Sequence, residues 1–169
     1  MSSRTVLAVV TAAAFALTAA PAHAASDPAP DPSVWTTLSK TYQATSKYGY
    51  EAFAPGGGYA GTDICVDDPD EGGMGYHYLN TKNIDSLDPA KPAALLYADG
   101  SDFVEGRRLV GVEWVVKDTG QKVPPTLFGQ DFQKDPKFPD VFTLHAWIYK
   151  PNPKGLFSPW NPDVVCPTG

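Results

Sequence analysis

The chain has 169 residues and a formal net charge of −6, because 19 acidic side chains outnumber 13 lysines and arginines. A net negative protein without a basic cluster does not attract a phosphate backbone, so the composition argues against a nucleic-acid partner. The 17 prolines and 15 glycines exceed average usage, and they predict short elements joined by rigid loops.

The first 24 residues have the three parts of a secretory signal peptide. Arg4 supplies a positive charge, residues 6–20 form an apolar run, and Ala22-His23-Ala24 is a small-x-small cleavage site. The apolar run is shorter than the roughly 20 residues that cross a bilayer, which favours cleavage over a membrane anchor. We therefore predict a secreted or extracytoplasmic protein, cleaved near Ala25, with no membrane segment in its mature form.

A short linker and a single globular domain are predicted after the signal peptide. Residues 25–32 are rich in proline and aspartate, as linkers often are, and the domain is expected over residues 33–169. Asp31-Pro32-Ser33 is typical of a helix start, because proline fits the first helical turn. Apolar residues at helical spacing predict a helix over 33–47 that runs towards Phe53, before Pro55 and the following glycines stop it.

From residue 58 onward the pattern is that of β structure. Apolar and aromatic runs predict strands over residues 74–79, 93–97, 107–116 and 142–149. The second and third of these strands are expected to form an antiparallel hairpin. Four prolines in residues 151–162 exclude a central strand, so this tail should wrap over the sheet. The predicted fold is α+β, with one N-terminal helix packed on a curved antiparallel sheet or partial barrel.

The two cysteines of the chain, Cys65 and Cys166, are predicted to form a disulfide. Two thiols in an exported protein usually pair, and the wrapping tail would bring Cys166 to Cys65. Two free thiols are the alternative. A structural zinc site is disfavoured because the chain has no C-x-x-C pair.

One acidic residue lies inside the most apolar predicted strand. Alternation places Glu113 on the same face as Leu109 and Val115. The opposite face then carries Val110, Val112 and Trp114. A carboxylate in such surroundings is costly to bury unless it is paired or bound to a cation.

Two histidines complete a candidate site. His77 and His145 are the only histidines beyond the predicted signal peptide, and each lies in a predicted strand among aromatic residues. With Glu113 they have the composition of a 2-His-1-carboxylate site, which binds a divalent metal such as zinc, copper or iron. The predicted pocket wall consists of Tyr76, Tyr78, Gln130 and Trp147. Two alternatives stay open: Glu113 forms a structural polar pair with one histidine, or the three positions are unrelated.

The segment from Gly72 to Tyr78 (GGMGYHY) resembles a motif of a family of small secreted bacterial proteins that has no assigned activity. The matching positions are Cys65, Asp68-Pro69, His77, Val112-Glu113, Leu127-Phe128-Gly129, Leu144-His145, Trp147 and residues 152–166. The resemblance covers nearly all of the mature chain. Relatives often carry histidine where this chain has Gln130, which weakens the case for a ligand at that position.

The sequence supports two hypotheses about function and leaves open whether the protein is an enzyme. In the first, it is a small extracytoplasmic metal-binding protein or metal-dependent enzyme that uses His77, Glu113 and His145, with a metal or a small molecule as its ligand. In the second, it is a non-catalytic extracellular ligand-binding module with an aromatic-lined cleft. The convergence or separation of the three side chains discriminates between these hypotheses.

Overall fold

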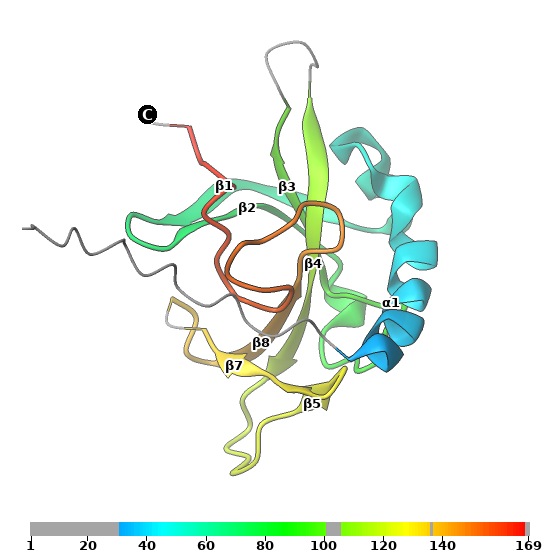
Figure 1. Ribbon diagram of the computed structural model, residues 1–169, viewed down its shortest axis with the longest axis vertical. Coiled ribbons are helices and arrows are strands. Elements are labelled where there is room, and N and C mark those ends of the chain that lie inside the picture. Colours follow the sequence, from blue (N-terminus) through cyan, green and yellow to red (C-terminus); the bar gives the residue numbers. More distant parts are fainter. Residues whose placement is uncertain (1–30, 101–105, 136, 168–169) are drawn as a thin grey trace, which may run out of the picture.

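The computed structural model describes residues 31–100, 106–135 and 137–167 of the chain (Figure 1). The predicted signal peptide and residues 25–30 of the predicted linker lie outside these residues. Among the described helices, none has the length and apolar character needed to cross a membrane.

The predicted N-terminal helix is confirmed and begins at the expected signal. Helix α1 spans Pro32–Thr45, and the side chain of Asp31 caps it by accepting a hydrogen bond from the backbone N–H of Ser33 at 2.8 Å. Proline at the first turn suits this position because no intrahelical hydrogen bond is lost there. The chain then tightens into two 3₁₀ segments, η1 (Ser46–Tyr48) and η2 (Glu51–Gly57).

Six antiparallel strands form one strongly curled sheet, a half-barrel beside which α1 lies (Figure 1). The order across the sheet is β1-β2-β3-β4-β8-β7. The strands are β1 (Ala60–Asp68), β2 (Gly72–Leu79), β3 (Ala94–Asp99), β4 (Arg107–Lys117), β7 (Gln133–Lys134) and β8 (Val141–Ala146). The short strands β5 (Thr126–Leu127) and β6 (Gln130–Asp131) pair separately, and the 3₁₀ turn η3 (Thr81–Asn83) follows β2.

The predicted hairpin is confirmed as β3 and β4, and it contains an irregularity that changes which residues share a face. Tyr97 pairs with Leu109 whereas Leu96 pairs with Gly111, so Val110 is an extra residue in β4. A one-residue insertion reverses the alternation of side chains beyond it. The prediction that Leu109 shares the face of Glu113, with Val110 opposite, is therefore wrong, because the two residues exchange faces.

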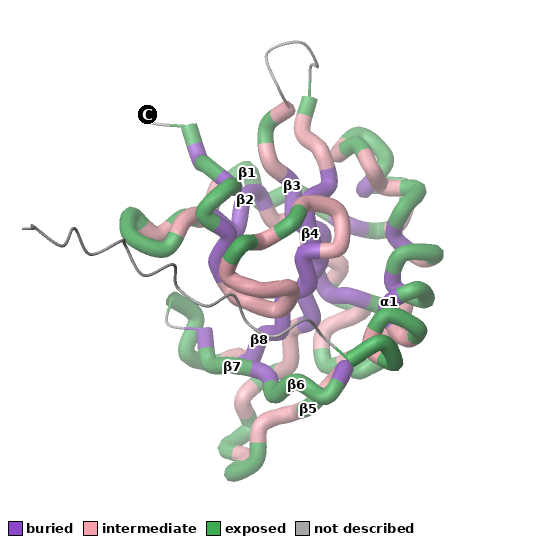
Figure 2. Tube along the Cα trace, in the orientation of Figure 1, coloured by how far each residue is buried: buried purple, intermediate pink, exposed green. Residues whose placement is uncertain are grey.

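Buried side chains form two clusters on the two faces of the sheet, and the tube in Figure 2 shows burial concentrated along the central strands. The larger cluster packs sheet residues against α1 and includes Leu38, Tyr76, Tyr78, Tyr97, Leu109 and Trp114. The smaller cluster contains Ala94, Leu96, Val110, Trp147 and Val164. The C-terminal segment therefore covers the second face of the sheet, in agreement with the prediction that the proline-rich tail wraps over the sheet.

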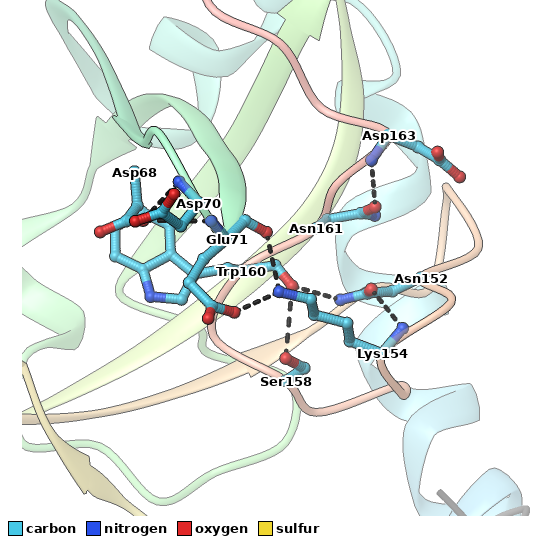
Figure 3. A network of polar contacts seen from close by, with 9 residues as sticks. All are labelled: Asp68, Asp70, Glu71, Asn152, Lys154, Ser158, Trp160, Asn161 and Asp163. Carbon is cyan, nitrogen blue, oxygen red and sulfur yellow. Dashed lines mark hydrogen bonds and ion pairs between the residues drawn. The ribbon is translucent and has the colours of Figure 1, made fainter. Parts of the chain in front are cut away.

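The C-terminal segment is attached to the sheet by a covalent bond and by polar contacts. Cys65 in β1 and Cys166 are joined by a disulfide with Cα atoms 5.7 Å apart, which confirms the predicted pair. Lys154 forms an ion pair with Glu71 in the β1–β2 turn (Figure 3), and the backbone of Asn161 pairs with that of Gly73 in β2. These contacts hold the tail beside the first two strands.

Candidate functional site

The two histidines and the glutamate come from three strands of the curled sheet. Glu113 in β4 pairs directly with His145 in β8, so their side chains are neighbours on one face. His77 lies in β2, on the other side of β3 from Glu113. On β3, Glu113 pairs with Ala94 and His77 pairs with Leu96, so the two side chains lie on the same face at diagonal positions across this strand.

The three side chains converge on one point. Nε2 of His77 lies 3.6 Å from Oε2 of Glu113, and Nε2 of His145 lies 3.7 Å from Oε1. One ligand atom from each residue lies within 4.8 Å of the other two, so the cluster could hold a metal ion. Both contacts are longer than an N–H···O hydrogen bond of about 2.7–3.2 Å. Two ligand atoms bound to one tetrahedral zinc ion would be about 3.4 Å apart, which is closer to the spacing observed.

The hydrogen bonding of His77 leaves its Nε2 free to act as a ligand. Its Nδ1 lies 3.2 Å from the carbonyl oxygen of Gly75, and a carbonyl only accepts, so Nδ1 carries the proton. The lone pair of Nε2 then points to Glu113. Gly75 adopts a φ of +85°, and a Cβ added there would lie 2.3 Å from the carbonyl oxygen of Tyr97. Only glycine fits this position. The backbone conformation of Gly75 sets the direction of its carbonyl, which in turn orients His77.

The hydrogen bonding of His145 is incomplete. Its Nε2 is buried and has no hydrogen-bond partner among the residues that the structure describes. Its ring stacks on Trp147, with centroids 6.3 Å apart and planes inclined by 13°. The ring is therefore held in one orientation, while the nitrogen directed at Glu113 is left without a proton donor or acceptor.

Burial favours the neutral form of all three groups. The side chains of His77, Glu113 and His145 are 13%, 5% and 2% exposed. Burial, with a smaller contribution from Asp135, raises the pKa of Glu113 to about 8. Burial also lowers the pKa of His77 to about 4 and, helped by the proximity of His77, lowers the pKa of His145 to about 3. The distances alone would suit an ion pair, but desolvation disfavours charge on either partner.

An apolar cavity of about 280 Å³ opens beside the cluster. His77, Glu113 and Asp135 line it, whereas His145 does not. Apolar side chains form most of the remaining wall, among them Ile64, Val66, Met74, Leu79, Val115 and Phe138. Ile64 belongs to β1 and Phe138 follows β7, so residues from the two ends of the curled sheet enclose one space.

The residues predicted as the pocket wall have different positions. Tyr76 and Tyr78 lie in the core cluster on the α1 side of the sheet, and Gln130 is exposed in β6 next to the start of α1. The structure therefore does not place these three at the cavity. Trp147 does not line the cavity either, but it stacks against His145.

Sequence reasoning missed Asp135, which lines the cavity. Its Oδ1 accepts hydrogen bonds from the backbone N–H groups of Lys137 at 2.7 Å and Phe138 at 3.1 Å. Aspartate two residues before an N–H donor is typical of an Asx turn. That signal predicts a turn, but it does not predict that the turn lines the same cavity as His77.

Comparison with known proteins identifies no relative. The chain matches no protein-family model, and neither a curated protein nor a solved structure shows significant similarity to it. Any function must therefore be argued from the cluster and the cavity.

Proposed function

We propose that the protein binds one divalent transition-metal ion through Nε2 of His77, Nε2 of His145 and the carboxylate of Glu113. The observation that carries the proposal is the buried Nε2 of His145, which has no hydrogen-bond partner among the described residues although it faces Glu113 at 3.7 Å. A buried polar atom left without a partner costs about 1–3 kcal/mol, and such atoms are rare in native proteins. A metal ion between the three ligand atoms would remove this cost.

The ligand set favours a transition metal over calcium or magnesium. Two imidazole nitrogens and one carboxylate are found in zinc sites with an open position and in non-haem iron(II) sites, and imidazole also binds copper. Both histidines are favoured in the neutral form that binds a metal. The hydrogen bond from Nδ1 of His77 to the Gly75 carbonyl is the kind of contact that orients metal-bound histidines.

The competing hypothesis is a structural polar pair between Glu113 and one histidine. Such a pair would be expected to form a hydrogen bond shorter than about 3.2 Å. Instead, Nε2 of His77 lies 3.6 Å from Oε2 of Glu113, and Nε2 of His145 lies at a similar distance, 3.7 Å, from Oε1. This symmetrical separation favours an ion in the centre.

Thermal unfolding with and without metal tests the proposal. The protein is first stripped with a chelator and then unfolded alone and with zinc, copper, iron(II) or manganese. A ligand at 100 times its dissociation constant stabilises the native state by about 2.7 kcal/mol, so at least one metal should raise the melting temperature clearly. The gain should disappear in His77→Ala and His145→Ala but persist in Gln130→Ala, a surface control. A melting temperature that no metal changes would overturn the proposal, as would a gain that survives both histidine substitutions.

We also propose that the protein is exported, as its resemblance to small secreted bacterial proteins suggests. The Cys65–Cys166 disulfide supports this location, because disulfides persist in oxidising compartments and are rare in the cytosol. Export would remove the leader after Ala24. N-terminal sequencing of protein recovered from outside the cytoplasm should therefore start near Ala25, and a chain still beginning at Met1 would contradict the proposal.

A further inference from the structure

The cavity beside the cluster has the size and character of a small-molecule site. Its volume of about 280 Å³ is near the lower end of the 300–1,000 Å³ typical of ligand pockets. The wall is apolar apart from two threonines and the groups near the cluster. Water gains few hydrogen bonds in such a space, so an apolar ligand would displace it favourably.

The cavity connects the surface with the buried cluster. Ile64 and Phe138 line it and are 64% and 60% exposed, whereas Met74 and Glu113 are 3% and 4% exposed. Nζ of Lys137 donates to the carbonyl of Asp67 at 2.5 Å, so a direct contact joins the two ends of the sheet near Phe138 and β1. The cavity therefore has an exposed apolar rim and a buried end at the cluster, held by contacts within the fold.

The arrangement of the three ligands leaves one side of the site open to the cavity. His77 and Glu113 belong to the cavity wall, while His145 is 2% exposed and does not line the cavity. A site with three protein ligands and an open position is typical of metal centres that bind a further molecule, whereas structural sites are closed by four. A molecule in the cavity would reach the ion from the side of His77 and Glu113.

The charges around the cavity select against an anionic ligand. Glu113 and Asp135 contribute two carboxylates, which balance the charge of one divalent ion. An anion would bring an uncompensated charge into an apolar space, and this is costly. We propose that the cavity binds a small, uncharged and mostly apolar molecule that coordinates the metal through one neutral nitrogen or oxygen donor. This inference rests on the proposed metal site.

A series of model ligands tests the inference on protein loaded with cobalt(II), whose visible absorption reports on coordination. The probes are 1-methylimidazole, 1-butylimidazole and butyrate. Each buried CH₂ group contributes about 0.8 kcal/mol, so three more of them should tighten binding of the butyl compound over the methyl compound by roughly 60-fold if all are buried. Butyrate should bind more weakly than 1-butylimidazole, because it carries a charge into the cavity.

Variants locate the binding site. Val115→Phe fills the cavity from β4, and it should abolish the advantage of the butyl chain while retaining the cobalt spectrum. Ile64→Ser, at the exposed rim, should reduce this advantage, and it remains informative if Val115→Phe does not fold. Val123 is 75% exposed and does not line the cavity, so Val123→Phe is a matched control that should bind as the wild type does.

The outcomes separate this inference from the proposal that it rests on. If cobalt gives no spectrum that depends on His77 and His145, the metal site itself is refuted. If cobalt binds there but the methyl and butyl compounds bind equally, or butyrate binds more tightly, only the inference about the ligand is overturned. A roughly 60-fold preference for the butyl compound that Val115→Phe removes would support it.

Discussion

Replacing Glu113 by glutamine distinguishes the metal site from a structural polar pair, because the two hypotheses predict opposite changes in stability. Glutamine has nearly the same size and polarity as a protonated glutamate but cannot ionise. The carboxyl group is only 4% exposed, and burial raises its pKa from 4.5 to about 8. In the metal-free protein, the native state therefore binds this proton more tightly than the unfolded state does.

The magnitude follows from this difference in pKa. Through this group, the free energy of unfolding of the metal-free protein falls as the pH rises from about 4.5 to about 8, and the loss at pH 7 is about 3 kcal/mol. Without metal, Glu113→Gln should therefore be more stable than the wild type by up to about 3 kcal/mol at pH 7. For a domain of this size, that corresponds to roughly 10 °C in the melting temperature. Removing one partner of a structural buried pair would instead cost about 3–5 kcal/mol.

The assay is urea unfolding at pH 7 of both chelator-treated proteins, repeated with zinc at a hundredfold excess over the dissociation constant of the wild type. Zinc should stabilise the wild type by about 2.7 kcal/mol and the variant far less, because the anionic ligand is gone. The difference in free energy of unfolding between the variant and the wild type should therefore shrink, or change sign, when zinc is added. A metal-free variant that is several kcal/mol less stable than the wild type would refute this reasoning, as would equal stabilisation of both proteins by zinc.

Two further predictions concern the framework around the site. Cys65 and Cys166 close a loop with a sequence separation of 101, and replacing both by serine opens it. The free energy of unfolding, measured in urea, should fall by up to about 4.7 kcal/mol. Equal stability of the variant and the wild type would show that the C-terminal segment stays in place without the disulfide. Burial alone would raise the pKa of Glu51, but hydrogen bonds from Tyr78 and Arg107 outweigh it and lower this pKa below 4.5. Glu51 thus contributes stability above its unfolded pKa, and this contribution is lost as the pH falls through the lowered value. Glu51→Gln should therefore weaken the dependence of the free energy of unfolding on pH at acid pH. An unchanged dependence would contradict this role.

Those parts of the fold that depend on local pattern could be predicted from the sequence. The start of α1 follows from Asp31 and Pro32, whose capping and fixed φ act within one turn. The β3–β4 hairpin follows from two apolar runs on either side of a short connection. Glu113 could be singled out because a carboxylate in an apolar strand requires a partner wherever the strand lies in the fold.

Features that depend on register could not be predicted. The extra residue Val110 shifts the alternation in β4, and although the adjacent Gly111 indicates a bulge, it does not specify which residue is the extra one. The approach of His77 to Glu113 across β3 depends on how three strands align, which alternation within one strand does not specify. Alternation did contain one usable signal, because Tyr76 must face away from the cavity if His77 faces into it.

The distribution of the three cluster residues over the strands has a consequence for the kinetics of folding. Strands β2, β3 and β4 follow one another as antiparallel neighbours, whereas β8 joins β4 only after residues 118–140. Local pairings cost less loop-closure entropy, so the meander that carries His77 and Glu113 is expected to form before β8 brings His145. An ion held by all three residues would therefore bind only after β8 has docked. It would slow the release of β8 and so lengthen the lifetime of the native state.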